Sequence, residues 1–117
     1  MEKDFSMAGK FELKKGKDGQ FMFNLKAANG QVILTSELYK TRPSAENGIE
    51  SVRKNSVRAG AFETRTNAKG EPYFILKATN GQEVGRSEYY SSTNAMENGI
   101  ESVKKNAPEA KLDDLTG

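Results

Sequence analysis

Apolar and polar positions alternate over residues 20–27. Phe21, Phe23 and Leu25 fall on one side of the alternation and Asn24 and Lys26 on the other. This period of two predicts a β-strand with one buried face. A turn pair, Asn-Gly at 29–30, follows, and the apolar run 32–35 supplies a return strand. With a further strand at 11–14, the pattern predicts a three-stranded antiparallel meander.

A different period follows the meander. Ala45, Gly48, Ile49 and Val52 are spaced as one face of an α-helix. Glycine lowers helix propensity by about 1 kcal/mol relative to alanine. Because Gly48 lies on the apolar face, we expect the helix to pass unusually close there to the sheet or to a second helix.

The whole pattern occurs twice. Residues 9–59 align with residues 60–110 without a gap, at an offset of 60 − 9 = 51 residues, and roughly half of the positions are identical. The block Glu46–Val52 recurs unchanged as Glu97–Val103. A unit of about fifty residues buries too little surface to be stable alone. Two units are therefore expected to share one core around a pseudo-twofold axis.

These elements predict an α+β fold of two tandem βββα repeats, with one antiparallel sheet and two helices packed on it. Repeat 1 is placed at 9–59 and repeat 2 at 60–110, within one shared domain over 9–112. Residues 111–117 are expected to form a closing strand or a tail. Residues 1–8 are expected to be a disordered N-terminal extension. A chain that contains both halves of the pseudo-dimer is predicted to be a monomer.

The amino-acid composition excludes several kinds of functional site. The 117 residues include neither cysteine nor histidine, which excludes disulfides, thiolate zinc sites, thiol nucleophiles and histidine bases. The adjacent carboxylates Asp113 and Asp114 do not make a cation cage. No metal, no cofactor and no enzymatic activity are therefore expected.

The charges are nearly balanced. Lysine and arginine number 18 against 16 acidic residues, a net charge of +2, which argues against a nucleic-acid or anionic-lipid partner. No apolar run is long enough to cross a bilayer. The first ten residues lack the apolar centre of a secretory signal, so a cytoplasmic location is expected.

The motif Ser-Glu-x-Tyr occurs in both repeats and has two interpretations. It places Glu37 and Tyr39 at the end of the first meander, and Glu88 and Tyr90 at the end of the second. In the structural interpretation, serine closes a turn, glutamate accepts from backbone N–H groups and tyrosine packs. In the functional interpretation, each repeat has a polar site with a carboxylate and a phenol. This second interpretation is the only one that would support an enzyme, and it is a weak alternative.

The sheet face opposite Phe23 and Leu25 is the other candidate surface. Its expected residues are apolar or basic except for Asn24: Met22, Asn24, Lys26, Val32, Leu34, Tyr73, Ile75 and Lys77. A terminal segment could cover this face, or a protein partner could bind it. A third interpretation is single-stranded nucleic acid, with bases stacked on Tyr73 and phosphates on Lys26 and Lys77.

The spacing of two motifs carries a family resemblance. Asn-Gly is followed after five residues by Ser-Glu-x-Tyr, and then by Gly-Ile-x-Ser-Val-Lys/Arg-x-Asn, in both repeats. This arrangement, over about residues 7–112, resembles the YegP-like family of small bacterial proteins of uncharacterised function. The resemblance implies two repeats in a single sheet, with exchange of terminal strands, and dimers of the same design for members with one copy. It implies no activity. It also suggests a start near Met7, which makes the preceding residues an extension or a misplaced start.

The leading hypothesis from sequence is therefore a small non-enzymatic cytoplasmic binding or interaction module of unknown ligand. Its alternatives are single-stranded nucleic-acid binding through the sheet and, more weakly, an enzyme that uses the Glu and Tyr pairs.

Overall fold

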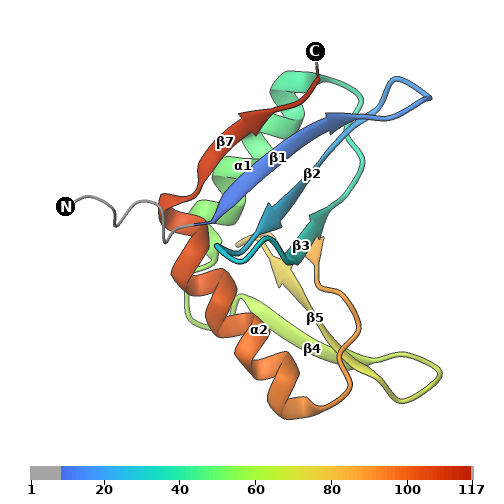
Figure 1. Cartoon of the computed structure of the whole chain (residues 1–117), viewed down its shortest axis with the longest axis vertical. Coiled ribbons are helices and arrows are strands. Elements are labelled where there is room, and N and C mark those ends of the chain that lie inside the picture. Colours follow the sequence, from blue (N-terminus) through green and yellow to red (C-terminus); the bar gives the residue numbers. More distant parts are fainter. Residues whose placement is uncertain (1–8, 117) are drawn as a thin grey trace.

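The computed structural model of the chain describes residues 9–116, so the prediction for residues 1–8 lies outside the described part. The chain folds as the predicted α+β arrangement, with two helices on one face of a single sheet (Figure 1). Its elements are, in order, β1 (Lys10–Lys15), β2 (Phe21–Lys26), β3 (Val32–Ser36), α1 (Arg42–Asn55), β4 (Phe62–Thr66), β5 (Pro72–Lys77), β6 (Glu83–Arg86), α2 (Thr93–Asn106), a 3₁₀ turn at Ala107–Glu109, and β7 (Lys111–Asp114).

The seven strands have the order β4-β5-β6-β3-β2-β1-β7. Each repeat is an antiparallel meander, and the two meanders join where β3 pairs with β6. In that central pair Thr35 lies opposite Arg86. These two residues are equivalent in the repeats, since 35 + 51 = 86, so the pseudo-twofold axis passes between them.

The final strand departs from the antiparallel pattern. β7 pairs with β1 in parallel, with Lys111 opposite Lys10 and Asp114 opposite Leu13, which makes the sheet mixed. It extends the edge of the sheet beside β1 and leaves the outer face uncovered (Figure 1).

Local sequence signals fix the helices. The Thr41 side chain accepts from the backbone N–H of Ser44 at the start of α1, and Ser92 accepts from Ala95 at the start of α2. Both helices have two basic residues in the last turn, where they complement the helix dipole. Neither helix of the described residues is long and apolar enough to cross a membrane.

The core lies between the sheet and the two helices. Its largest fully buried apolar residues come from both repeats, as expected for a shared core: Phe11, Leu13, Phe23, Leu25, Leu34, Ile49, Val52, Phe74, Leu76 and Val103.

One residue faces the opposite side from that predicted. Leu34 pairs with Leu25 and is fully buried in the core, so its placement on the outer face is wrong. A β-bulge between Leu25 and Lys26 shifts the register and reverses the face on which β3 presents its side chains. On the outer face itself, Ile75 is fully buried among the side chains of the neighbouring strands, which include Glu63 and Arg86 opposite it.

Candidate functional site

The two Ser-Glu-x-Tyr segments connect the last strand of each meander to its helix. The Ser36 hydroxyl accepts from the Phe23 N–H at 2.9 Å and donates to the Glu37 carbonyl at 2.7 Å. Ser87 makes the same two bonds with Phe74 and Glu88, at the same distances. The serines therefore have the structural role, because each one ties its loop to the central strand of its own meander.

The tyrosines lie where the helices come closest to the sheet. Tyr39 stacks on Phe23 with a centroid distance of 6.2 Å and an interplanar angle of 11°, and both rings lie against Gly48 of α1. A Cβ atom on Gly48 would lie 2.8 Å from Tyr39 Cζ, which explains the glycine on the apolar face of the helix. Tyr90, Phe74 and Gly99 repeat the arrangement in the second half of the molecule.

Burial sets the protonation of both phenols. Loss of hydration raises the pKa of Tyr39 and of Tyr90, and the nearby Glu37 and Glu88 charges raise them further. Both hydroxyls therefore remain protonated at neutral pH, which suits hydrogen-bond donation to a ligand and does not suit a catalytic base.

Glu37 meets a residue of the other repeat. A hydrogen bond to Glu83, reinforced by burial, raises the pKa of Glu37. Burial also acts to raise the pKa of Glu83, but the bonds from Arg86 and Glu37 outweigh it and lower that pKa. Arg86 Nε lies 2.9 Å from the Glu83 carboxylate. The contact with Glu83 therefore favours the protonated form of Glu37, and Arg86 favours the charged form of Glu83.

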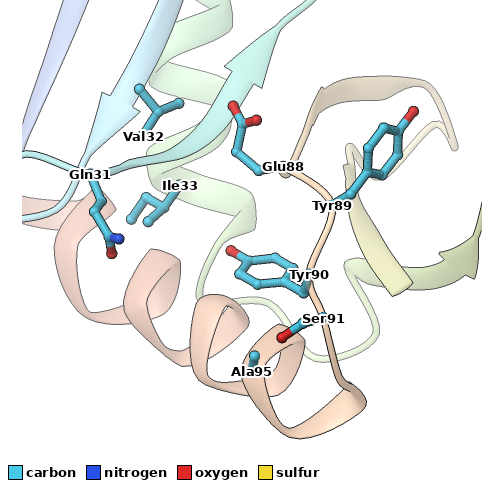
Figure 2. Close-up of a pocket in the computed structure, with 8 residues that line it drawn as sticks. All are labelled: Gln31, Val32, Ile33, Glu88, Tyr89, Tyr90, Ser91 and Ala95. Carbon is cyan, nitrogen blue, oxygen red and sulfur yellow. The ribbon is translucent and has the colours of Figure 1, made fainter. Parts of the chain in front are cut away.

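The second loop meets the first repeat in the same manner but with a different result. Figure 2 shows Glu88 and Tyr90 facing a hollow that repeat 1 completes with Ile33. The hollow has a volume of about 540 Å³ and is lined by residues from both repeats: Gln31, Val32, Ile33, Glu88, Tyr89, Tyr90, Ser91 and Ala95. We call this the inter-repeat pocket.

Several lining residues differ between the two sites, and one of these differences changes the surroundings of the glutamate. Val32 stands at the position equivalent to Glu83, since 32 + 51 = 83, so Glu88 has an apolar neighbour where Glu37 has an acid. Within residues 9–116, no side chain forms an ion pair or hydrogen bond with the Glu88 carboxylate. The inter-repeat pocket therefore combines an available carboxylate, the Tyr90 phenol, the Gln31 amide and an apolar floor.

The other predicted residues lie elsewhere, on the outer sheet face. Lys26 Nζ is 3.1 Å from the Glu12 carboxylate, and Lys77 forms an ion pair with Glu63. The bond from Lys26 lowers the pKa of Glu12 despite the burial of its carboxyl group. Each of the two lysines thus already has an acidic partner.

Tyr73 is also occupied. Its ring packs edge-on against Tyr89 at a centroid distance of 5.3 Å, and the Arg86 guanidinium lies 5.7 Å from the ring centroid. The structure therefore brings Glu88 and Tyr90 together in a pocket, and it places Tyr73, Lys26 and Lys77 apart from that pocket.

Sequence reasoning missed the residues that complete these sites. Gln31, Val32 and Ile33 belong to the first hairpin, far along the chain from Glu88, and their proximity depends on the pairing of β3 with β6. The presence of Val32 at the position equivalent to Glu83 was a signal that the sequence alone contained. Among residues 9–116, no group of three or more acidic side chains is placed to hold a metal ion.

Comparison with known proteins identifies both repeats. A family model described as a domain of unknown function, DUF1508, matches the chain twice, over residues 17–63 and 67–114. A UPF0339 protein of Mannheimia succiniciproducens is 64% identical over 108 residues, which cover 92% of this chain and 96% of that protein. The UPF0339 protein YegP of Yersinia pestis is 54% identical over 108 residues, with the same coverage of both chains.

Two solution NMR structures have the same fold. The yegP protein of E. coli, described as a protein of unknown function, has a TM-score of 0.89 and 50% identity over 95% of this chain and 96% of that one. A UPF0339 protein of Shewanella oneidensis has a TM-score of 0.89 and 49% identity over 94% of this chain and 93% of that one.

Proposed function

Since this chain belongs to the DUF1508 family, whose description assigns no activity, we propose its function from its own site: a non-enzymatic binding module of the cytoplasm that holds a cationic group in the inter-repeat pocket. The ligand class is an amine or guanidinium on a short apolar stem, as in an exposed lysine or arginine side chain of a partner protein. A cysteine-free fold needs no oxidising compartment, which is compatible with the cytoplasm.

The Glu88 carboxylate carries this proposal. It lies at the pocket without a cationic partner among the described residues, near the aromatic ring of Tyr90, whereas the Tyr89 ring packs on Tyr73 outside the pocket. A carboxylate next to aromatic faces favours a cation, by charge and by cation–π attraction. The apolar side chains of Val32, Ile33 and Ala95 would contact the stem of the bound group.

The composition of the pocket supports binding without catalysis. It contains no thiol or imidazole, because the chain has neither, and the Tyr90 phenol is held in its protonated form. General acid–base chemistry needs a group whose pKa lies near the working pH. A phenol whose pKa is raised further from neutrality is a poor base, so the pocket fits recognition better than reaction.

The outer sheet face fits nucleic acid less well than the pocket fits a cation. Phosphate binding depends on lysine and arginine side chains that can exchange counterions for phosphates. Lys26 and Lys77 are instead paired with Glu12 and Glu63, and Tyr73 already contacts Tyr89 and Arg86. We therefore expect no RNA mobility shift at physiological salt.

An NMR titration of the full chain tests the proposal. The probes are N-acetyl-lysine amide and N-acetyl-arginine amide, with N-acetyl-norleucine amide as the uncharged control. We expect amide shifts at Gln31, Ser91 and Ala95 with the cationic probes. Glu88→Gln should weaken their apparent affinity about tenfold, and the matched variant Glu37→Gln should leave it unchanged. Equal shifts with norleucine, or full binding by Glu88→Gln, would contradict the proposal.

A further inference from the structure

The first strands of the two repeats, β1 and β4, differ in whether a further strand pairs with their outer side. β1 would be an edge strand, but β7 lies beside it and pairs with it in parallel. At the opposite end, β4 pairs with β5 on one side, and no strand of the described residues pairs with its other side (Figure 1). Because β1 and β4 are equivalent in the repeats, the position beside β4 is the counterpart of the one that β7 fills.

The backbone of β4 presents its hydrogen-bonding groups to that vacant position. The Lys77 N–H donates to the Ala61 carbonyl at 2.9 Å, so the groups of Ala61, Glu63 and Arg65 turn toward β5. In an antiparallel pair the intervening residues turn the other way. The N–H and C=O groups of Phe62 and Thr64 are therefore directed outward, where a further strand could bond them.

The first repeat shows how such a bond is made. The Leu115 N–H donates to the Leu13 carbonyl at 2.8 Å, and Asp114 forms an ion pair with Arg42 at the start of α1. Thr64 is the equivalent of Leu13, since 13 + 51 = 64. The outward carbonyl of Thr64 thus matches one that already accepts a strand in the other half.

A surface hollow marks the same place in repeat 2. It has a volume of about 300 Å³ and lies between the end of β4 and the start of α2, lined by Thr64, Arg65, Thr66, Pro72, Thr93 and Met96. Thr93 is the equivalent of Arg42, so this hollow corresponds to the place where the end of β7 contacts α1 in repeat 1.

The chain path explains why this position has no strand from the chain itself. After α2 the chain continues into β7, beside β1. After α1 the equivalent residues turn at Gly60, where φ is +79°, and become β4 itself. The tandem connection therefore uses, as the first strand of repeat 2, the segment that would have covered the edge.

We propose that the outer edge of β4 binds an extended segment of a partner protein, which pairs in parallel with Phe62–Thr66 as β7 pairs with β1. This is β-augmentation, in which an edge strand accepts a peptide through main-chain bonds. It concerns a different surface from the inter-repeat pocket and does not depend on the function proposed for that pocket.

The side chains at the edge define the sequence that the segment would carry. On the helix side, Thr93 and Met96 stand where repeat 1 has Arg42 and Ala45. In repeat 1 the basic Arg42 binds Asp114 of β7, but in repeat 2 the equivalent position is uncharged. The residue of the bound segment that lies opposite Thr64 should therefore be apolar. On the outer side, the next residue lies opposite Arg65. The Arg65 guanidinium already binds Glu63 at 2.6 Å, but its five N–H donors allow a second acidic partner, so this residue should be acidic. The segment is therefore an extended strand with an apolar residue followed by an acidic one.

Hydrogen exchange on the full-length chain tests this edge. The probe is a synthetic peptide of residues 110–117 that carries Asp114→Val and Leu115→Asp. We expect it to slow exchange of the Thr64 and Thr66 amides at least tenfold. The peptide with the unchanged sequence should protect them less, because it places an acid where the hollow is apolar.

Two controls isolate the main-chain bonds. Thr64→Pro removes the outward N–H while leaving the β5 side of the strand intact, so it should abolish protection, whereas Thr64→Val should retain it. If Thr64→Pro fails to fold, a peptide N-methylated at the position of Leu115 serves instead, since that N–H makes the bond in repeat 1. Glu88→Gln should leave peptide binding unchanged.

Several results would overturn the proposal. These are no protection at saturating peptide, protection that survives both controls, or protection of β1 through displacement of β7. A concentration-dependent dimer that Thr64→Pro abolishes without peptide would assign the edge to a second copy of the chain and would equally overturn it.

Discussion

The Leu34 side chain occupies the space that a side chain on Gly85 would need. The two residues are equivalent in the repeats, since 34 + 51 = 85, and they lie beside the pseudo-twofold axis. A Cβ atom on Gly85 would be 3.0 Å from Leu34 Cγ and 3.0 Å from the Thr35 carbonyl oxygen. The centre of the core therefore has room for only one large side chain of this pair. Repeat 1 supplies it as Leu34, and repeat 2 has Gly85 at the equivalent position.

This arrangement predicts a compensating pair of substitutions. Gly85→Leu should lower the free energy of unfolding by about 1–3 kcal/mol through overpacking. Leu34→Gly should lower it by more than about 2 kcal/mol through the cavity that it leaves. The double variant should be more stable than the sum of the two losses predicts, by at least about 1 kcal/mol. Urea unfolding of the four proteins measures this coupling, and strictly additive losses would contradict it.

Gly48 should resist the usual stabilising exchange of glycine for alanine. Alanine raises helix propensity by about 1 kcal/mol. At this position the new methyl group would meet Tyr39 and lie 3.0 Å from Phe23 Cε2, so we expect Gly48→Ala to destabilise the chain. Thermal melts should show a smaller loss when Tyr39→Phe is also present, because the phenolic oxygen is the nearest atom. A rise in Tm for Gly48→Ala alone would refute the packing role of Tyr39.

The Glu37–Glu83 pair predicts a pH-dependent gain in stability. Because the folded pKa of Glu37 is raised above its ordinary value of 4.5, its contribution is fully present below pH 4.5 and is lost as the pH rises through the raised pKa. Glu37→Gln keeps the hydrogen bond without the charge. Its Tm should exceed that of the wild type at pH 7, and the difference should shrink toward zero near pH 4.

The matched control for that experiment is Glu88→Gln, since Val32 stands at the position of Glu83 in the other half. A Glu37→Gln difference that is the same at pH 4 and pH 7 would show that the contact with Glu83 does not raise the pKa of Glu37.

Most of the fold could be predicted because it is encoded locally and twice. The alternation through Phe23 and Leu25, the Asn-Gly turns and the spacing of Ile49 and Val52 each reflect one element and its buried face. The face of β3 could not be predicted, because the bulge that turns Leu34 inward arises where β2 and β3 pair.

The candidate site was only half predictable for a similar reason. Glu88 and Tyr90 stood out as a repeated motif, but the residues that complete the pocket come from the other repeat. The pairing of β3 with β6 sets that contact, and it joins segments about fifty residues apart. The pairing of Lys26 and Lys77 with glutamates likewise depends on strand register.

The parallel pairing of β1 with β7 also determines how the molecule would respond to force. The chain enters at the start of β1 and leaves at the far end of β7, so tension applied through the two ends would slide these strands past each other. Their hydrogen bonds would then be loaded together in shear and would have to break at once, not one after another as in a zipper. A domain with this geometry should unfold under an atomic-force cantilever at a higher force than one whose terminal strands peel apart.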